Sequence, residues 1–131
     1  MNERINVSSG SPWEDVVGYS RAVRVGNFIE ISGTTAVDGQ NVIGVNDMYL
    51  QTQFILEKLN ETLQQCGGDL KDVVRTRMFI TDIGQWKDAA KAHRDFFANI
   101  KPVSTMVEVS RLIHPDLLIE IELSAIIQGD I

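Results

Sequence analysis

The chain has 131 residues, a formal net charge of −6 and a sequence pI of about 4.8. Its 12 Lys and Arg residues are scattered, which argues against a nucleic-acid-binding surface because phosphate binding needs clustered cations. The length suits one domain, 1–131, and no stretch approaches the ~18 continuous apolar residues of a membrane span. Cys66 is the only cysteine and the N-terminus lacks an apolar signal sequence, so we expect a reducing, cytoplasmic location.

The first third of the sequence predicts a loop followed by a β-hairpin. Residues 1–18 are mostly polar and include a Ser, Gly and Pro cluster typical of a loop. Residues 20–25 then alternate in polarity, and the pair Gly26-Asn27 favours a two-residue turn because both residues tolerate positive φ. The returning strand covers residues 28–32 and ends at Gly33. The glycine-containing loop beyond it has room for another short strand.

A long amphipathic helix is predicted next, because apolar residues recur every three or four positions. Asn46 or Asp47 can cap its start, and Gly67-Gly68 ends it by supplying a left-handed conformation. Its inward-facing stripe consists of Met48, Thr52, Ile55, Leu59, Leu63 and Cys66.

A second helix is predicted from about Gly84 to Asn99. Asp82 with Gln85 three residues later resembles a capping box at its start. Its inward-facing stripe consists of Trp86, Ala89, Ala90, His93, Phe96 and Phe97.

The remaining strands are predicted at Val73–Thr81, Thr105–Leu112 and Leu117–Ile127, with a turn at His114-Pro115-Asp116 before the last one. The order is therefore strands, helix, strand, helix and two strands. This order predicts an α+β fold in which both helices pack on one face of a single sheet.

The last strand has one apolar row and one acidic row. Leu117, Ile119, Ile121 and Leu123 alternate with Leu118, Glu120, Glu122 and Ser124. If the apolar rows meet the helices, the opposite sheet face carries Glu108, Glu120 and Glu122. Solvent is one explanation of such a face. Another subunit is the alternative, because Met106, Leu118 and Ile126 interrupt the polar row.

Four segments together resemble the Rid family, also called the YjgF, endoribonuclease L-PSP-like or RutC-like family. They are VGYSRAVRVGNFIEISG, VVRTRMFITDI, VEVSRL and IEIELSAI, in that order from about Tyr19 to Ile127. The resemblance implies a chorismate-mutase-like α+β fold. It also implies a homotrimer with the sheets toward the threefold axis, the helices outside and a cleft between each pair of subunits.

The resemblance also implies a reaction, and one residue of this sequence differs from those that family members use for it. The best-known members hydrolyse reactive imines to a keto acid and ammonia, and grip the substrate carboxylate with an arginine in a Pro-small-Arg-Ser sequence. The matching segment here begins at Pro102, and Ser104 stands where that arginine would be. A serine supplies no charge and no bidentate contact. This chain therefore resembles the branch that lacks the arginine. Arg75 and Arg77 share a strand face, but we expect them to pair with the acidic row or with solvent.

Other positions carry over from the family to a small-molecule site. The expected ligand-binding residues are Tyr19, Ser32, Gly33, Ser104, Thr105 and Glu120, and the one candidate catalytic residue is Glu120, as a water orienter or base. Met106 replaces a cysteine often found in the deaminases, and Ala90 lies near the place of an asparagine. Structural explanations remain open for Tyr19, Gly33, Ser104, Thr105 and Glu120, such as packing for Tyr19 or a turn for Gly33.

No cofactor or metal is expected, since His93, His114 and Cys66 fall at no metal-ligand spacing. A triad of Ser104, His93 and an acid is not favoured, because no nucleophile elbow is present. The preferred hypothesis is a trimer that binds a small metabolite between subunits, without the deaminase activity. Imine or enamine hydrolysis with a different substrate anchor is the alternative. Ribonuclease activity fits the charge of −6 poorly.

Overall fold

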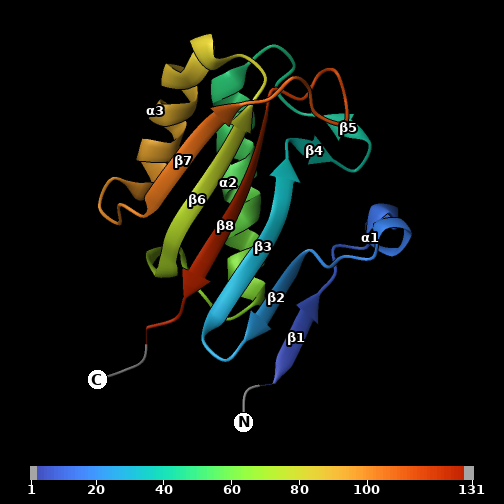
Figure 1. The fold of residues 1–131 in the computed structure, drawn as a ribbon, viewed down its shortest axis with the longest axis vertical. Helices are drawn as coiled ribbons and strands as arrows, with labels where there is room; N and C mark the ends of the chain where they lie inside the picture. Colours follow the sequence, from blue (N-terminus) through green and yellow to red (C-terminus); the bar gives the residue numbers. More distant parts are fainter. Residues whose placement is uncertain (1–2, 129–131) are drawn as a thin grey trace.

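The computed structural model describes residues 3–128, which form a six-stranded sheet with two long helices on one of its faces (Figure 1). The strands lie in the order β1-β2-β3-β8-β6-β7. Neighbouring strands are antiparallel except β6 and β7, which are parallel and joined through a helix. The predicted α+β class is confirmed. The strands of this sheet are β1 Arg4–Val7, β2 Ala22–Val25, β3 Phe28–Thr35, β6 Val73–Ile80, β7 Val103–Glu108 and β8 Ile119–Ile126.

Helix α2, Met48–Gln65, matches its prediction closely. Asp47 is the cap, and its Oδ1 accepts a hydrogen bond of 3.0 Å from the Leu50 backbone N–H. At the other end Gly67 adopts a φ of 82°, which turns the chain away from the helix. All six residues of the predicted stripe are buried. Within residues 3–128, no helix combines the length and the apolarity that a membrane span requires.

Helix α3, Trp86–Phe97, is shorter than predicted and is preceded by a 3₁₀ turn, η2, at Ile83–Gln85. Asp82 caps this turn by accepting from the Gly84 backbone N–H at 2.9 Å. The placement of Trp86 in the inward stripe was wrong, since its side chain is 48% exposed. The helix turns its small residues to α2 instead, and the buried positions of α3 are Ala89, Ala92 and Phe97.

The N-terminal residues are more structured than predicted. The expected loop contains strand β1, which pairs with β2, and the short helix α1, Pro12–Val17. Ser11 caps α1, and the buried Glu14 carboxylate accepts from the Ser9 backbone N–H at 3.0 Å. Elements this short have little periodicity of their own, and their order depends on such tertiary partners.

The hairpin turn at Gly26-Asn27 is confirmed, and only Gly26 uses a positive φ, of 58°. Strand β3 then continues through Gly33 to Thr35, so Gly33 lies within a strand and not at its end. A short hairpin follows, formed by β4, Val37–Asp38, and β5, Asn41–Val42. Gln51 of α2 holds the segment just before β8. Its side-chain amide accepts from the Leu118 N–H at 2.8 Å and donates to the Asp116 carbonyl at 2.8 Å.

The faces of β7 are reversed relative to the prediction. Ser104 is in register with the buried Thr76, so it points to the helices, whereas Thr105 is in register with Arg77 on the other face. Met106, two residues after Ser104, lies on the same face and packs against the core. Glu108 also lies on the helix side, where its carboxylate accepts from the Ile83 N–H at 2.9 Å. The expectation that Glu108 joins the acidic row was therefore wrong.

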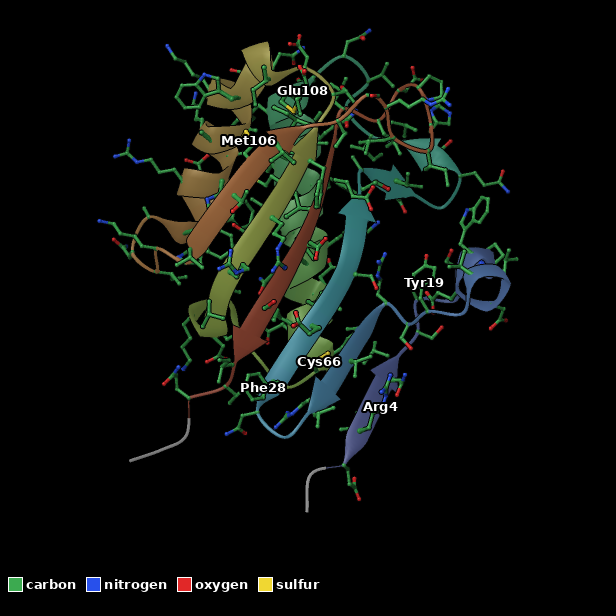
Figure 2. The ribbon with its side chains drawn as sticks, viewed as in Figure 1. Arg4, Tyr19, Phe28, Cys66, Met106 and Glu108 are labelled. Carbon is green, nitrogen blue, oxygen red and sulfur yellow. The ribbon has the colours of Figure 1, made fainter. Side chains whose placement is uncertain are left out.

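The sheet face opposite the helices, here called the open face, mixes apolar and charged side chains. Both long helices, α2 and α3, lie on the opposite face, and among residues 3–128 no other long helix covers the open face (Figure 1). Phe28 is 62% exposed at the β2–β3 end, where Figure 2 labels it. Glu122 forms an ion pair of 3.4 Å with Arg77. The register assigns to this face Val23, Val25, Phe28, Glu30, Arg75, Arg77, Phe79, Val103, Thr105, Val107, Glu120, Glu122, Ser124 and Ile126.

Candidate ligand site

Glu120 and Gly33 are in direct contact. The β3–β8 pairing shifts register between Ile31 and Thr34, and this bulge brings Gly33 against the neighbouring strand. A Cβ added at Gly33 would lie 2.1 Å from Glu120 Oε2 and 3.0 Å from its Cδ. Gly33 has no positive φ, so its requirement is for space. Two residues predicted for the site, 87 positions apart in the chain, are therefore brought together.

The surroundings of Glu120 favour its neutral form. Burial raises the pKa of the Glu120 carboxyl, and the negative charge of Glu122 adds to this, while the guanidinium of Arg21 opposes it. Within residues 3–128 the Glu120 carboxylate accepts no hydrogen bond from a side chain or backbone N–H. A carboxyl group in this condition is suited to holding a water molecule or a polar ligand group.

Arg21 is the site residue that sequence reasoning missed. Its Nη2 donates to the Gly33 carbonyl at 2.7 Å, and its Cζ lies 5.9 Å from the centre of the Tyr19 ring. Its Nε is fully buried and finds no acceptor among the described residues. The alternation Arg21, Val23, Val25 could have indicated that this arginine lies on the open face, beside the predicted Tyr19.

A second cation, Lys58 of α2, reaches the same end of β3. Its ammonium group donates to the carbonyls of Val37 at 2.9 Å and Thr35 at 3.3 Å. Burial lowers the pKa of Lys58, and the charge of Arg21 lowers it further. The two cations are thus close enough to interact, and the charge of Arg21 also acts on Glu120.

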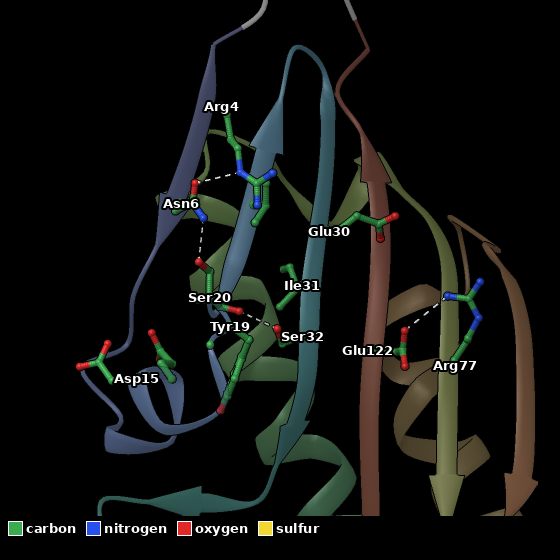
Figure 3. Close-up of a pocket in the computed structure, with 13 residues that line it drawn as sticks. Arg4, Asn6, Asp15, Tyr19, Ser20, Glu30, Ile31, Ser32, Arg77 and Glu122 are labelled. Atoms are coloured by element: carbon green, nitrogen blue, oxygen red, sulfur yellow. Dashed lines mark hydrogen bonds and ion pairs between the residues drawn. The ribbon is translucent and has the colours of Figure 1, made fainter.

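Tyr19 and Ser32 line a hollow of about 720 Å³ on the open face, between α1, β1 and β3 (Figure 3). The Ser32 hydroxyl donates to the Ser20 carbonyl at 2.6 Å, which ties the start of β2 to β3. Arg77 and Glu122 form the far side of the hollow. Gly33 and Glu120 lie outside its lining. The hollow adjoins them through Ser32, which precedes Gly33 and donates its backbone N–H to the Arg21 carbonyl at 3.0 Å, and through the contact of the Tyr19 ring with Arg21.

Ser104 and Thr105 lie away from Glu120, at the β7 edge. Ser104 faces the helices, and its Oγ accepts from Thr76 Oγ1 at 2.8 Å. Thr76 Oγ1 also lies 2.9 Å from Nε2 of His93 on α3. Burial lowers the pKa of His93. Within one subunit, Ser104 is therefore part of a series of hydroxyl and imidazole contacts on the helix side of the sheet, whereas Glu120 lies on the open face.

The remaining residues singled out from the sequence lie elsewhere. Cys66 is buried at the end of α2, where Figure 2 labels it, and Arg24 Nη1 donates to its carbonyl at 2.8 Å. His114 accepts from the Asp116 N–H at 3.0 Å in the predicted turn. Ala90 is half-buried on α3. Across residues 3–128, no group of three His, Cys, Asp or Glu side chains is placed to hold a metal ion.

Comparison with known protein families decides the relationship of this chain. A family profile described as Endoribonuclease L-PSP matches residues 11–127. The chain belongs to the endoribonuclease L-PSP family. Members of this family with the RutC name are among its relatives. A RutC family protein of Pyrococcus abyssi is 36% identical over 107 residues, covering 79% of this chain and 82% of the relative. The 3-aminoacrylate deaminase RutC of Acinetobacter baylyi is 31% identical over 122 residues, covering 92% and 95%.

Solved structures of the endoribonuclease L-PSP family agree with this assignment. A member of the YjgF/YER057c/UK114 family from Mycobacterium tuberculosis is 44% identical and superposes with a TM-score of 0.87, covering 95% of this chain and all of that one. A Rid family protein from Yersinia pestis is 26% identical with a TM-score of 0.82, again over 95% of this chain and 100% of that one. The resemblance to the Rid family and the YjgF-like fold are confirmed.

Proposed function

We propose that this single Rid-type domain, 1–131, is a homotrimer that binds a small metabolite in clefts between its subunits. Glu120, against Gly33 on the open face, carries this proposal, and Tyr19 and Ser32 line the hollow on the same face. Ser104 and Thr105 lie at the β7 edge, and Ser104 points to the opposite face. A single copy does not bring these two groups together. A neighbouring copy that contributes its β7 edge would complete the site.

The open face supports the trimer. Val103 and Val107 of β7 are exposed there, together with Phe28 of β3, and exposed apolar side chains on a sheet face are typical of an interface. Val107→Lys places a charge in the proposed interface and should convert the trimer to monomers in light scattering after gel filtration. Val16→Lys is the matched control, because Val16 is exposed on α1. A monomeric parent protein, or a Val107→Lys trimer, would contradict the proposal.

Position 104 supports binding without the deaminase reaction. Losing a desolvated, charge-assisted pair costs roughly 2–5 kcal/mol, or a factor of ~30 to several thousand in affinity. Ser104 cannot supply that interaction, and its hydroxyl is engaged with Thr76. We therefore expect little or no acceleration of imine hydrolysis. The test is ammonia release from freshly generated 2-aminoacrylate, with and without the protein.

Imine hydrolysis is the alternative, favoured by the deaminase name of the Acinetobacter baylyi relative. In that reaction Glu120 would orient a water molecule that adds to the C=N carbon. The water oxygen becomes the keto oxygen, the C–N bond breaks, and ammonia leaves with the protons of the water. Acceleration that disappears in Glu120→Ala would establish this alternative. If Ser104→Arg gains activity that the parent lacks, the site of the parent protein lacks only the arginine that grips the substrate carboxylate.

RNA cleavage, which the family description suggests, is a third candidate with less support. The net charge of −6 opposes RNA binding. Cleavage that survives stringent purification and is abolished by changing Arg75 or Arg77 would be required to favour it.

We propose that the protein is cytoplasmic, because its one cysteine is free and buried.

A further inference from the structure

A hollow of about 590 Å³ lies at the end of α3, where the chain turns into β7 (Figure 1). Its lining consists of His93, Arg94, Phe97, Ala98, Asn99, Lys101 and Pro102, so among the described residues its only charged groups are cations. The acidic neighbour in sequence, Asp95, accepts from the Tyr49 hydroxyl on α2 instead. In a chain with a net charge of −6, a hollow of this kind is a local site of attraction for small anions.

Lys101 has a backbone conformation that lysine rarely adopts. Its φ is 54°, in the left-handed region, and its N–H donates to the Phe97 carbonyl at 2.9 Å, which closes the turn after α3. Glycine or asparagine is the usual residue at this position after a helix, because a longer side chain is strained there. The chain therefore places an ammonium group at the hollow at a cost in stability, which favours a binding role for it.

The contacts of Thr76 assign the tautomer of His93. The Thr76 hydroxyl has one hydrogen, which it donates to Ser104 Oγ. Nε2 of His93, 2.9 Å from Thr76 Oγ1, must then be the donor in the second contact. At pH 7 the ring is neutral, since burial lowers the pKa of His93 from 6.5, so Nδ1 carries no hydrogen. Among residues 3–128 no N–H or O–H group donates to this nitrogen.

The hollow thus offers two cations and one hydrogen-bond acceptor. Arg94 and Lys101 suit the oxygens of an anion, whereas Nδ1 of His93 requires a donor. An anion that meets both requirements must keep a proton on one of its oxygens. Phosphate does so at pH 7, but carboxylates do not, and neither does sulfate, which has the same shape.

We propose that this hollow is a phosphate-binding site. Arg94 and Lys101 bind the anionic oxygens, and Nδ1 of His93 accepts a hydrogen bond from the protonated one. Thr76 and Ser104 are positioning residues, because their contacts keep the hydrogen of the ring on Nε2. The proposal is independent of the open-face cleft, since none of the lining residues belongs to the open face.

The test compares inorganic phosphate with sulfate by calorimetric titration at pH 7 and constant ionic strength, with the full-length protein. We expect the parent to bind phosphate about tenfold or more tightly than sulfate, although sulfate carries more charge. Lys101→Gly, which suits the left-handed backbone, should weaken the binding of both anions about fivefold or more. His93→Phe keeps a ring and should abolish the preference for phosphate. Lys87→Gln, at the other end of α3, is the control for net charge and should change neither.

Two results of the titrations would overturn the proposal and leave the open-face cleft untouched. The first is a parent that binds neither anion, or binds sulfate as tightly as phosphate. The second is a Lys101→Gly variant that binds phosphate as the parent does, because Lys101 would then serve only the end of α3. Urea unfolding of each variant separates a loss of binding from a loss of stability.

The tautomer of His93 gives a second measurement, which needs no variant to fold. Long-range 1H–15N NMR distinguishes a ring protonated at Nε2 from one protonated at Nδ1. His114, the other histidine of the chain, is the internal reference, since its Nδ1 accepts from the Asp116 N–H. We expect both rings to be protonated at Nε2, and phosphate to shift the Nδ1 resonance of His93. Protonation of His93 at Nδ1 in the free protein would overturn its assigned role.

Discussion

Gly33→Ala tests whether the Gly33–Glu120 contact is as tight as the structure indicates. The added Cβ would lie 2.1 Å from Glu120 Oε2, and the three nearest heavy atoms are all in the Glu120 side chain. A carbon in van der Waals contact is ~3.5–4.0 Å from its neighbour, so the carboxylate has to move by about 1.4 Å or more. No backbone atom is among these three, so the strain falls on one flexible side chain.

The expected cost follows from that geometry. A side chain forced off its rotamer costs about 0.5–1.5 kcal/mol, and overpacking in a tight site costs about 1–3 kcal/mol. Because the end of a flexible side chain gives way, we expect Gly33→Ala to lower the free energy of unfolding by about 1–2 kcal/mol. In a Glu120→Ala background the three clashing atoms are absent. There the same change should be neutral, or stabilising by about 0.4–1 kcal/mol through the unfolded chain.

The measurement is urea unfolding of four proteins: the parent, each single variant and the double variant. Circular dichroism at pH 7 would follow the transition, at one fixed protein concentration because oligomerisation links stability to concentration. The expected coupling between the two positions is about 1–3 kcal/mol. If Gly33→Ala costs the same in both backgrounds, Glu120 does not pack on Gly33, and the geometry of the proposed site is refuted.

Three further predictions concern other groups. Burial raises the pKa of Glu120 above 4.5, so the parent should lose stability as the pH rises through the raised value, and Glu120→Gln should remove this loss in unfolding curves measured across pH. Thr76→Val removes the contacts with His93 and Ser104 and should lower the free energy of unfolding in urea by about 1–3 kcal/mol. Ser104→Ala keeps the Thr76–His93 contact and should cost less. Equal costs would contradict the chain of contacts. Burial raises the pKa of the Cys66 thiol, so Ellman's reagent should label it slowly until denaturant is added, and rapid labelling of the folded protein would contradict this.

Much of the fold could be predicted because its signals are local. The stripe of α2 repeats over 18 residues, and its cap and glycine terminator follow from the residue types at its two ends. The family resemblance added the chorismate-mutase-like fold and the identity of Glu120 and Gly33 as site candidates. In contrast, β1 and α1 were missed, because four and six residues carry too little periodicity to be recognised without their neighbours.

Sequence by itself therefore determined the fold class, the family and the absence of a cation at position 104. Only the tertiary structure decided which face of β7 meets the helices, because both rows of that strand mix apolar and polar residues and the register with β6 selects between them. It also decided the surroundings of Arg21. An arginine next to a strand is ordinarily solvated, but this one is half-buried, because a bulge 12 residues away brings the Gly33 carbonyl to its guanidinium. Alternation along a strand reports two faces, but only packing determines what each face contacts.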